Sequence, residues 1–165
     1  MPDLLQIGGI TDTMRDRLSE HFTIHKLDDA AYPAEAITHI ATNGHDGVPA
    51  DVMAACPNLK MVSCYGVGYD AIDTKAAADR GILVTHTPDV LNAEVASTTI
   101  LLMLASFRNF LADEAHARSG AWEQGGAPLS RSADNRRVGI LGLGRIGQAI
   151  ADKLAAFNAD IHYHT

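Results

Sequence analysis

Short apolar runs alternate with helix-like patterns over residues 4–86. The apolar runs cover residues 4–9, 37–42, 59–64 and 82–86, and the helix-like patterns cover 11–22, 50–57 and 73–81. This alternation predicts an α/β fold in which a parallel sheet carries helices on its faces. Thr11 or Thr13 can cap the first helix. Asp73 can cap the third helix, and Gly81 can end it where a left-handed residue is needed.

The second half of the chain follows a different pattern. Residues 92–118 predict one long helix that is apolar nearly all round in its middle, as in a bridge packed on both sides. Residues 119–137 are rich in Gly, Ser and charge, and a fresh strand begins at Val138. Although 165 residues could form one domain, this punctuation predicts one domain over 1–95 and the start of a second over 96–165. The second domain shows a single strand–helix–strand unit, which cannot form a covered sheet alone.

The motif GLGRIG connects the strand to the helix in that unit. Gly142 allows the tight turn, Gly144 lets a pyrophosphate approach the backbone, and Gly147 lets the helix pack closely on the strand. The helix that begins near Arg145 points its free N–H groups toward such an anion. The motif therefore predicts dinucleotide binding, and the alternative is a glycine-rich structural turn.

The end of the following strand indicates which dinucleotide is bound. An NAD-specific site places an acid there, but this strand ends in His164 and Thr165, and Asp160 comes before the strand. A 2'-phosphate is then tolerated, and His164 or Thr165 could donate to it, which favours NADPH over NAD. His162 and His164 share one strand face, but without a third ligand nearby we expect no metal site.

Composition excludes several other classes of protein. The chain is 47% hydrophobic and 20% charged, which is typical of a globular protein. Its net charge is -7 and its basic residues are scattered, so we expect no nucleic-acid partner. The N-terminus lacks a signal-peptide pattern and residues 98–107 are too short to span a membrane, so we expect a cytosolic protein. Cys56 and Cys64 are expected to be buried and reduced.

Four motifs in fixed order carry a resemblance to a known family: GVGYDAID at 66–73, THTPDVLNAEVA at 85–96, RSGAW at 118–122 and VGILGLGRIGQAIA at 138–151. The sequence resembles the D-isomer-specific 2-hydroxyacid dehydrogenases, and within them most the glyoxylate/hydroxypyruvate and hydroxyphenylpyruvate reductases. The resemblance implies a flavodoxin-like parallel-sheet substrate domain followed by the first βαβ unit of a Rossmann dinucleotide-binding domain. These reductases tend to prefer NADPH.

The resemblance also assigns substrate-binding residues. It implies that the backbone N–H groups of Val67 and Gly68 bind the substrate carboxylate. The physical setting agrees, because a loop at the carboxyl end of a strand is where open α/β sheets bind ligands. A plain glycine-rich turn is the alternative. Asn43 and Gly44 follow a neighbouring strand and are expected to line the same pocket.

For the cofactor, the resemblance implies that Thr99 contacts the nicotinamide end and that Arg145 and Ile146 contact the pyrophosphate. The alternative for Thr99 is a helix threonine bonded to its own turn. The family's catalytic Arg, Glu and His match no position in this chain, and its eight histidines fit no such role. The chain is therefore expected to be the front half of an enzyme, inactive alone.

The function expected of the intact parent is reduction of a small 2-keto acid, such as glyoxylate or hydroxypyruvate, to the D-2-hydroxy acid with NADPH. The alternatives are a dinucleotide-sensing, protein-binding module similar to corepressor relatives of the family, and a structural module without a ligand. A homodimer is expected through the helix at 92–118 and the following arm at 118–126, which carries Trp122, because one thin domain cannot cover so much apolar surface.

Overall fold

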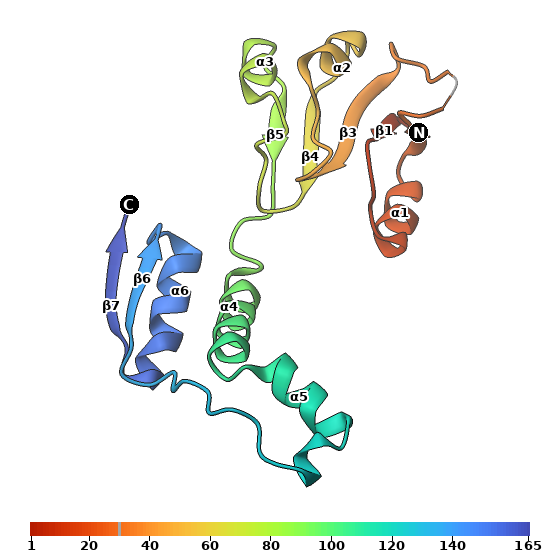
Figure 1. Ribbon diagram of the computed structural model, residues 1–165. Helices are drawn as coiled ribbons and strands as arrows, with labels where there is room; N and C mark the ends of the chain where they lie inside the picture. The colour runs from red at the N-terminus through yellow and green to blue at the C-terminus, as the bar shows by residue number, and fades with distance from the viewer. Residues whose placement is uncertain (30) are drawn as a thin grey trace. The chain divides into compact units, whose positions relative to one another are not determined.

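The computed structural model describes residues 1–29 and 31–165 and divides into two compact units, Met1–Val90 and Leu91–Thr165 (Figure 1). Each unit has its own sheet. The assignment of residues 1–95 to a substrate domain and of 96–165 to a cofactor domain stays a prediction.

The first unit is an α/β layer built on a five-stranded parallel sheet with the order β2-β1-β3-β4-β5. Its strands are β1 (Asp3–Gln6), β2 (Thr23–Lys26), β3 (Ile37–Asn43), β4 (Met61–Tyr65) and β5 (Leu83–Thr85). Its helices are α1 (Asp12–Ser19), α2 (Ala50–Ala55) and α3 (Thr74–Asp79). The predicted parallel sheet and its three helices are confirmed. Strand β2 was not predicted.

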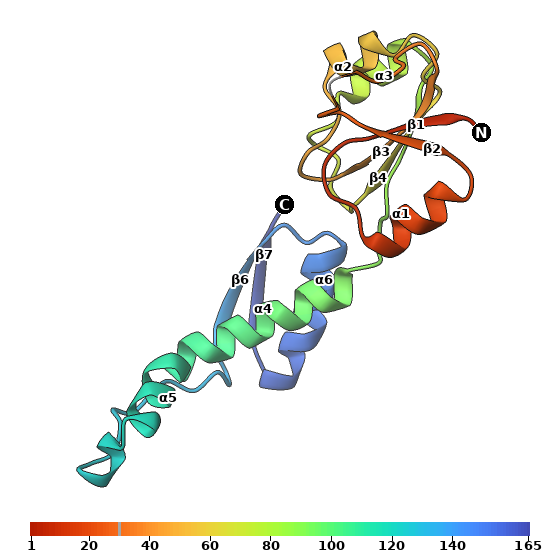
Figure 2. The ribbon, with the colours of Figure 1, turned by 90° about the vertical axis from the view of Figure 1, so that its right-hand side faces the viewer.

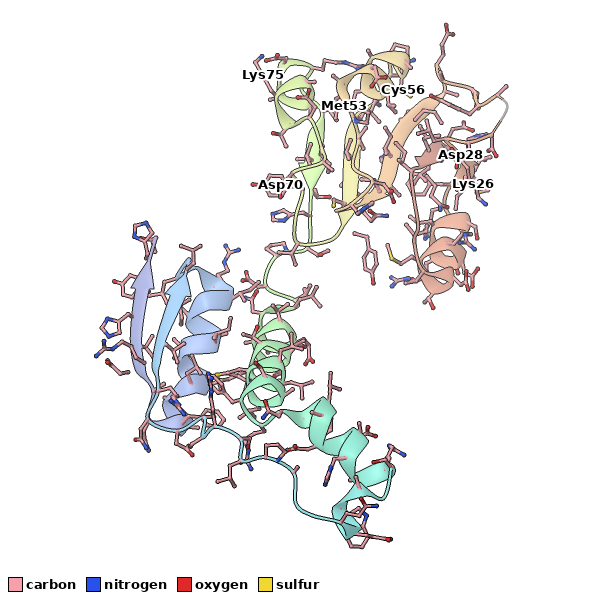
Figure 3. The ribbon with its side chains drawn as sticks, viewed as in Figure 1. Lys26, Asp28, Met53, Cys56, Asp70 and Lys75 are labelled. Carbon is pink, nitrogen blue, oxygen red and sulfur yellow. The ribbon has the colours of Figure 1, made fainter. Side chains whose placement is uncertain are left out.

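The core of this unit lies between the sheet and the α2 and α3 helices. Leu5, Ile37 and Val62 of the sheet are fully buried, and Met53 and Cys56 of the α2 segment pack against the same core (Figure 3). Helix α1 lies on the opposite face of the sheet and buries none of its residues (Figure 2). The two faces of the sheet are therefore covered unequally.

The predicted helix signals in this unit are confirmed. The Thr11 side chain accepts a hydrogen bond from the N–H of Met14, and the Asp73 carboxylate accepts one from Ala76. Gly81, which follows the C-cap residue Arg80 of α3, has a φ of +68°. Cysteines 56 and 64 are both free and buried, as expected. Burial raises the pKa of both thiols.

The second unit corrects the prediction of one long helix over 92–118. The structure has two helices, α4 (Asn92–Phe107) and α5 (Phe110–Arg118), which meet at an angle of 62°. Asn109 stands between them in the left-handed conformation, with a φ of 50°, so the helix cannot continue through it. Among the described residues no single helix is long and apolar enough to cross a membrane, although α4 and α5 pass that test jointly as a bent pair.

The rest of the second unit is the predicted strand–helix–strand. Strand β6 (Arg137–Leu141) pairs in parallel with β7 (Asp160–His164), and α6 (Arg145–Leu154) connects them. Asp160 was expected before the second strand but is its first residue, paired with Arg137. Helix α4 packs against α6. It was expected to be covered on both sides, yet within this chain Leu101 and Leu102 are 63% and 64% exposed.

Candidate functional site

Loops that follow neighbouring strands of the first unit meet at the carboxyl edge of its sheet. The Asn43 side chain, at the end of β3, donates to the carbonyl of Gly9 after β1, at 3.2 Å. The loop after β3 and the loop after β4 are joined by a bridge between Val48 and Ile72. This edge is where ligands bind in open parallel sheets, so it is the first place to seek a substrate site.

Asn43 has a structural task at this edge. Its Oδ1 accepts from the N–H groups of His45 and Asp46, each at 2.8 Å, and its Nδ2 donates to the Asp46 carboxylate at 2.6 Å. The hydrogen bonds from Asn43 and then His45 lower the pKa of Asp46 below its usual value. The polar atoms of Asn43 thus hold the loop in shape, and its contact with substrate stays a prediction.

Gly44 lets the loop after β3 approach the loop after β4. A Cβ on Gly44 would lie 2.6 Å from the carbonyl oxygen of Gly68, and a Cβ on Gly66 would lie 3.1 Å from the nitrogen of Gly44. Both contacts are with backbone atoms, which cannot move aside as a flexible side chain can. The structure therefore brings Gly44 and Gly68, two of the predicted substrate residues, into direct contact.

The two peptide groups on either side of Val67 are held by hydrogen bonds from the segment that follows β5. The carbonyl of Gly66 accepts from the N–H of Thr87 at 2.9 Å, and the carbonyl of Val67 accepts from the His86 ring at 2.8 Å. No peptide bond among the described residues is cis, and in a trans peptide the C=O and the next N–H point in opposite directions. The N–H groups of Val67 and Gly68 therefore point away from the segment that contains His86 and Thr87.

These two N–H groups are available to a ligand. Within residues 1–29 and 31–165, no protein acceptor receives a hydrogen bond from the N–H of Val67 or of Gly68. Gly68 is exposed and Val67 is half-buried. Adjacent N–H groups of this kind form a nest that attracts a carboxylate or another small anion. This arrangement gives the predicted residues a means of binding the carboxylate of a substrate.

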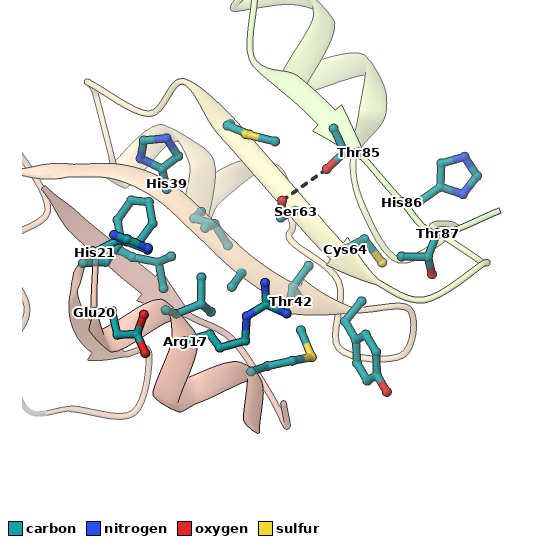
Figure 4. Close-up of a pocket in the computed structure, with 18 residues that line it drawn as sticks. Arg17, Glu20, His21, His39, Thr42, Ser63, Cys64, Thr85, His86 and Thr87 are labelled. Carbon is teal, nitrogen blue, oxygen red and sulfur yellow. Dashed lines mark hydrogen bonds between the residues drawn. The ribbon is translucent and has the colours of Figure 1, made fainter. Parts of the chain in front are cut away.

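A groove lies on the less covered face of the sheet and extends to Tyr65, which precedes this loop, and to His86 (Figure 4). It has a volume of about 610 Å³ and runs between Met14 and Leu18 of α1 and the strands β3, β4 and β5. The Ser63 and Thr85 hydroxyls are 3.2 Å apart across β4 and β5 within it. Most of its exposed lining area is apolar, although Arg17, Glu20 and His39 are among the polar side chains that line it.

The predicted cofactor loop occupies the turn between β6 and α6. Gly142 has a φ of +87°, which an L side chain rarely adopts, and a Cβ on Gly147 would lie 2.2 Å from the Gly142 carbonyl oxygen. A Cβ on Gly144 would meet no atom within 4 Å. Arg145 and Ile146 form the first residues of α6, and the N–H groups in the first turn of a helix have no acceptor within the helix itself. The space beside Gly144 fits the approach of a pyrophosphate.

The end of β7 lies beside this loop. The N–H of Gly142 donates to the carbonyl of His164 at 2.7 Å, so the structure brings these two predicted cofactor residues together, and Thr165 follows directly. Asp160 lies at the other end of the strand, where hydrogen bonds from His162 and then Arg137 lower its pKa. Within the described part of the chain, no three His, Cys, Asp or Glu side chains are grouped closely enough to hold a metal ion.

Thr99 lies within α4. Its hydroxyl donates to the carbonyl of Val95 at 2.8 Å, which is the bond that the structural alternative requires. Contact between Thr99 and a nicotinamide stays a prediction.

The sequence did not single out His86 or the Cys64 thiol as parts of the loop. His86 is one of the eight histidines that match no catalytic role of the family, and the sequence predicts only that Cys64 is buried and reduced. The Cys64 thiol lies 3.5 Å from the Gly68 carbonyl, to which it donates. The one available signal was position, because both residues lie at the carboxyl ends of strands.

Fold and loops together define an α/β protein with a five-stranded parallel sheet, at whose carboxyl edge two adjacent backbone N–H groups have no acceptor among the described residues. The model of the D-isomer specific 2-hydroxyacid dehydrogenase catalytic domain matches residues 9–160. The chain therefore belongs to the D-isomer-specific 2-hydroxyacid dehydrogenase family, and the resemblance found in the sequence is confirmed.

Curated relatives include a 2-ketogluconate reductase of Gluconobacter oxydans, 40% identical over 165 residues, with 98% of this chain and 53% of the relative covered. A glyoxylate/hydroxypyruvate reductase A of Arabidopsis thaliana is 41% identical over 130 residues, with 79% of this chain and 42% of the relative covered. The chain thus spans about half the length of the curated relatives it matches.

Solved structures of the same family are also similar to this chain, which again covers about half of each. A 2-hydroxyacid dehydrogenase from Ketogulonicigenium vulgare is 43% identical, with a TM-score of 0.92, and the match covers 98% of this chain and 54% of that one. An NADPH-dependent glyoxylate/hydroxypyruvate reductase from Sinorhizobium meliloti, in complex with NADP and malonate, is 42% identical, with a TM-score of 0.88 and coverage of 99% and 53%.

Proposed function

We propose that this chain forms part of an NADPH-dependent reductase that converts a small 2-keto acid of the glyoxylate or hydroxypyruvate type into the D-2-hydroxy acid. The observation that carries the proposal is the outward direction of the N–H groups of Val67 and Gly68, at the carboxyl edge of a parallel sheet. The related enzyme from Sinorhizobium meliloti was crystallised with malonate, a small carboxylic acid.

In this proposal the first unit is the flavodoxin-like substrate domain. The two amides bind the carboxylate common to 2-keto acids and hold it at a fixed edge of the sheet. Asn43 and Gly44 support the loop from the neighbouring strand. Since the family's catalytic Arg, Glu and His match no position here, we expect the 165-residue chain by itself to be inactive.

The second unit is proposed as the first βαβ unit of a Rossmann domain. Its fit to a dinucleotide rests on the open space beside Gly144 and on the N-terminus of α6, where Arg145 and Ile146 would contact the pyrophosphate. When bound, NADPH supplies the hydride. His164 and Thr165 lie at the end of β7 beside the loop, without a carboxylate that would repel a 2'-phosphate.

The activity test uses the full-length protein. Purified enzyme is mixed with NADPH and glyoxylate or hydroxypyruvate, and oxidation of the cofactor and the chirality of the product are measured. We expect the D-2-hydroxy acid, with a lower Kd for NADPH than for NADH. A protein that binds NADPH but reduces no 2-keto acid would contradict the proposal and would instead fit a dinucleotide-sensing binding module.

The preference for NADPH over NADH can be tested with a substitution at His164. Replacing His164 by Asp adds a carboxylate that can accept from the ribose hydroxyls of NADH and that repels the 2'-phosphate of NADPH. Each charged hydrogen bond of this kind contributes about 1.5–3 kcal/mol, which corresponds to roughly one to two powers of ten in affinity. Titration of both cofactors measures the effect. If His164→Asp leaves their ratio unchanged, His164 does not discriminate between them.

A homodimer through α4, α5 and the arm at 118–126 is also proposed. The apolar side chains exposed on these segments are Leu101, Leu102, Phe110, Leu111 and Trp122, each at least 57% exposed. Burying such a surface against a second copy is favourable. Light scattering of the full-length protein at micromolar concentration tests this, and a monomer would contradict it.

A further inference from the structure

The His86 side chain contacts the loop that contains Val67 from the β5 side. It is the first residue after β5, and its Nδ1 lies 2.8 Å from the carbonyl oxygen of Val67, nineteen residues away in the chain. A carbonyl oxygen can only accept, so Nδ1 must carry the proton. The contact therefore fixes both the position and the tautomer of the neutral ring.

This bond sets the direction of a whole peptide group. The Val67 carbonyl and the Gly68 N–H belong to one planar trans peptide, so they point in opposite directions. As long as the Val67 carbonyl faces His86, the Gly68 N–H faces away from it. Rotation of the peptide would replace this donor by a carbonyl oxygen, which repels a carboxylate.

Such a peptide needs to be held. A peptide followed by glycine rotates at little cost, because glycine accepts either sign of φ. The adjacent Gly66 carbonyl is fixed by a main-chain donor, the N–H of Thr87. For the next carbonyl, of Gly68, the donor found within residues 1–29 and 31–165 is the weak Cys64 thiol at 3.5 Å. The peptide between Val67 and Gly68 thus depends on the His86 side chain.

The ring of His86 is itself held in place. Tyr69 packs against it edge to face, with ring centroids 4.8 Å apart and planes at 72°. This geometry is favourable for aromatic rings and limits rotation of the imidazole. Tyr69 belongs to the same loop as Val67, so the loop and the ring restrain each other.

We propose that His86 is a positioning residue for substrate, which keeps the Gly68 N–H directed at the carboxylate of the 2-keto acid. The inference rests on the proposed function, because it assumes that this N–H binds the substrate. It adds a residue that acts through the backbone and that touches neither the carboxylate nor the reacting carbon.

The test compares His86→Leu, which removes the donor, with His86→Asn, whose side-chain N–H can reach the same acceptor as Nδ1. In the full-length enzyme we expect His86→Leu to raise KM for glyoxylate by about tenfold, with kcat and KM for NADPH nearly unchanged. His86→Asn should restore most of the wild-type KM. His25→Leu is the matched control, because it removes a histidine of the edge strand β2 that lies 2.7 Å from Asp3 of β1, away from the loop.

A structural readout separates this inference from the proposed function. A crystal structure of His86→Leu should show the peptide between Val67 and Gly68 rotated or in two orientations, and malonate, used as a probe, should bind more weakly. His86→Gln replaces His86→Leu where the latter does not fold, since its amide cannot occupy the Nδ1 position. If the peptide keeps its wild-type orientation and KM is unchanged, the inference is overturned.

If the wild-type protein reduces no 2-keto acid and binds no malonate, the proposed function fails. The orientation of the peptide between Val67 and Gly68 in His86→Leu then still shows whether His86 positions that peptide. A rotated peptide would leave the positioning role standing for a different anion, and an unchanged peptide would end it.

Discussion

Gly144 and Gly147 stand three residues apart in one loop, but their substitution by alanine should have opposite effects on the protein. A Cβ on Gly144 would meet no atom within 4 Å, and the φ of this residue is -73°, which alanine adopts without strain. A Cβ on Gly147 would lie 2.2 Å from the Gly142 carbonyl oxygen, whereas real Cβ atoms essentially never come closer than 3.0 Å. Gly147→Ala thus disturbs the fold, and Gly144→Ala disturbs only a ligand.

The magnitudes follow from these contacts. Because the atom facing Gly147 belongs to the backbone, α6 must move away from β6, and overpacking of this kind costs about 1–3 kcal/mol. Gly144→Ala reduces the entropy of the unfolded chain and should stabilise the fold by about 0.4–1 kcal/mol. Its methyl group would occupy the space proposed for the pyrophosphate. The loss of one charged hydrogen bond there weakens NADPH binding by roughly ten- to a hundredfold.

Two measurements on each variant check the reasoning. Thermal unfolding should give a lower Tm for Gly147→Ala and an equal or higher Tm for Gly144→Ala. Titration with NADPH should show weaker binding for Gly144→Ala. Gly139→Ala in β6 is the control, since its Cβ also meets no atom within 4 Å, and both quantities should stay near wild type. A Gly144→Ala protein that binds NADPH as tightly as wild type would refute the assignment of this loop to the pyrophosphate.

Two further substitutions test the first unit. Asn43→Ala removes the larger of the two side-chain hydrogen bonds that lower the pKa of Asp46. The lowered pKa contributes stability that is present above the ordinary pKa of the carboxyl and is lost as pH falls through the folded-state pKa, so the acid unfolding midpoint measured by circular dichroism should move to higher pH in the variant. Arg80→Met removes guanidinium contacts to main-chain carbonyls at the end of α2. The free energy of unfolding in urea should fall by about 1–3 kcal/mol, and an unchanged value would show that those carbonyls are satisfied by water.

Much of the sheet could be predicted because its strands carry a strong signal. Strands β3 and β4 are apolar runs bounded by turn residues, and their buried positions include Ile37, Ile40 and Val62. Strand β2 carries no such signal. It is a four-residue edge strand in which no residue is fully buried, so its amino acids do not alternate clearly between core and solvent.

The break between α4 and α5 was missed for a related reason. Apolar residues continue on both sides of Asn109, so the hydrophobic pattern reads as one helix. Asparagine is among the few residues that adopt the left-handed conformation at small cost, and here it does so with a φ of 50°. The left-handed conformation of Asn109 depends on local backbone energy. The spacing of apolar residues along the chain therefore does not reveal it.

The loop that contains Val67 was predicted as a substrate site from the family resemblance, and its position agrees with that prediction, because strand ends in parallel sheets are places for ligands. What the sequence could not indicate is the support given by His86, because this contact joins residues that are distant in the chain and follow no periodic pattern. Asn43 illustrates the converse. Its amide type is common in binding sites, yet its polar atoms are occupied by Gly9, His45 and Asp46.

A site made of main-chain N–H groups limits how sequence can shape it, because every residue except proline offers the same donor. The residues that can shape such a site are therefore those around the amides: glycine at 44, which allows a 2.6 Å approach to Gly68, and His86, which holds the Val67 carbonyl. If the proposed function holds, these supports act on the carboxylate shared by all 2-keto acids, and their substitution should weaken binding of glyoxylate and hydroxypyruvate by the same factor. Discrimination between such substrates must then come from residues that contact the other end of the molecule, so equal losses for both would place specificity outside this loop.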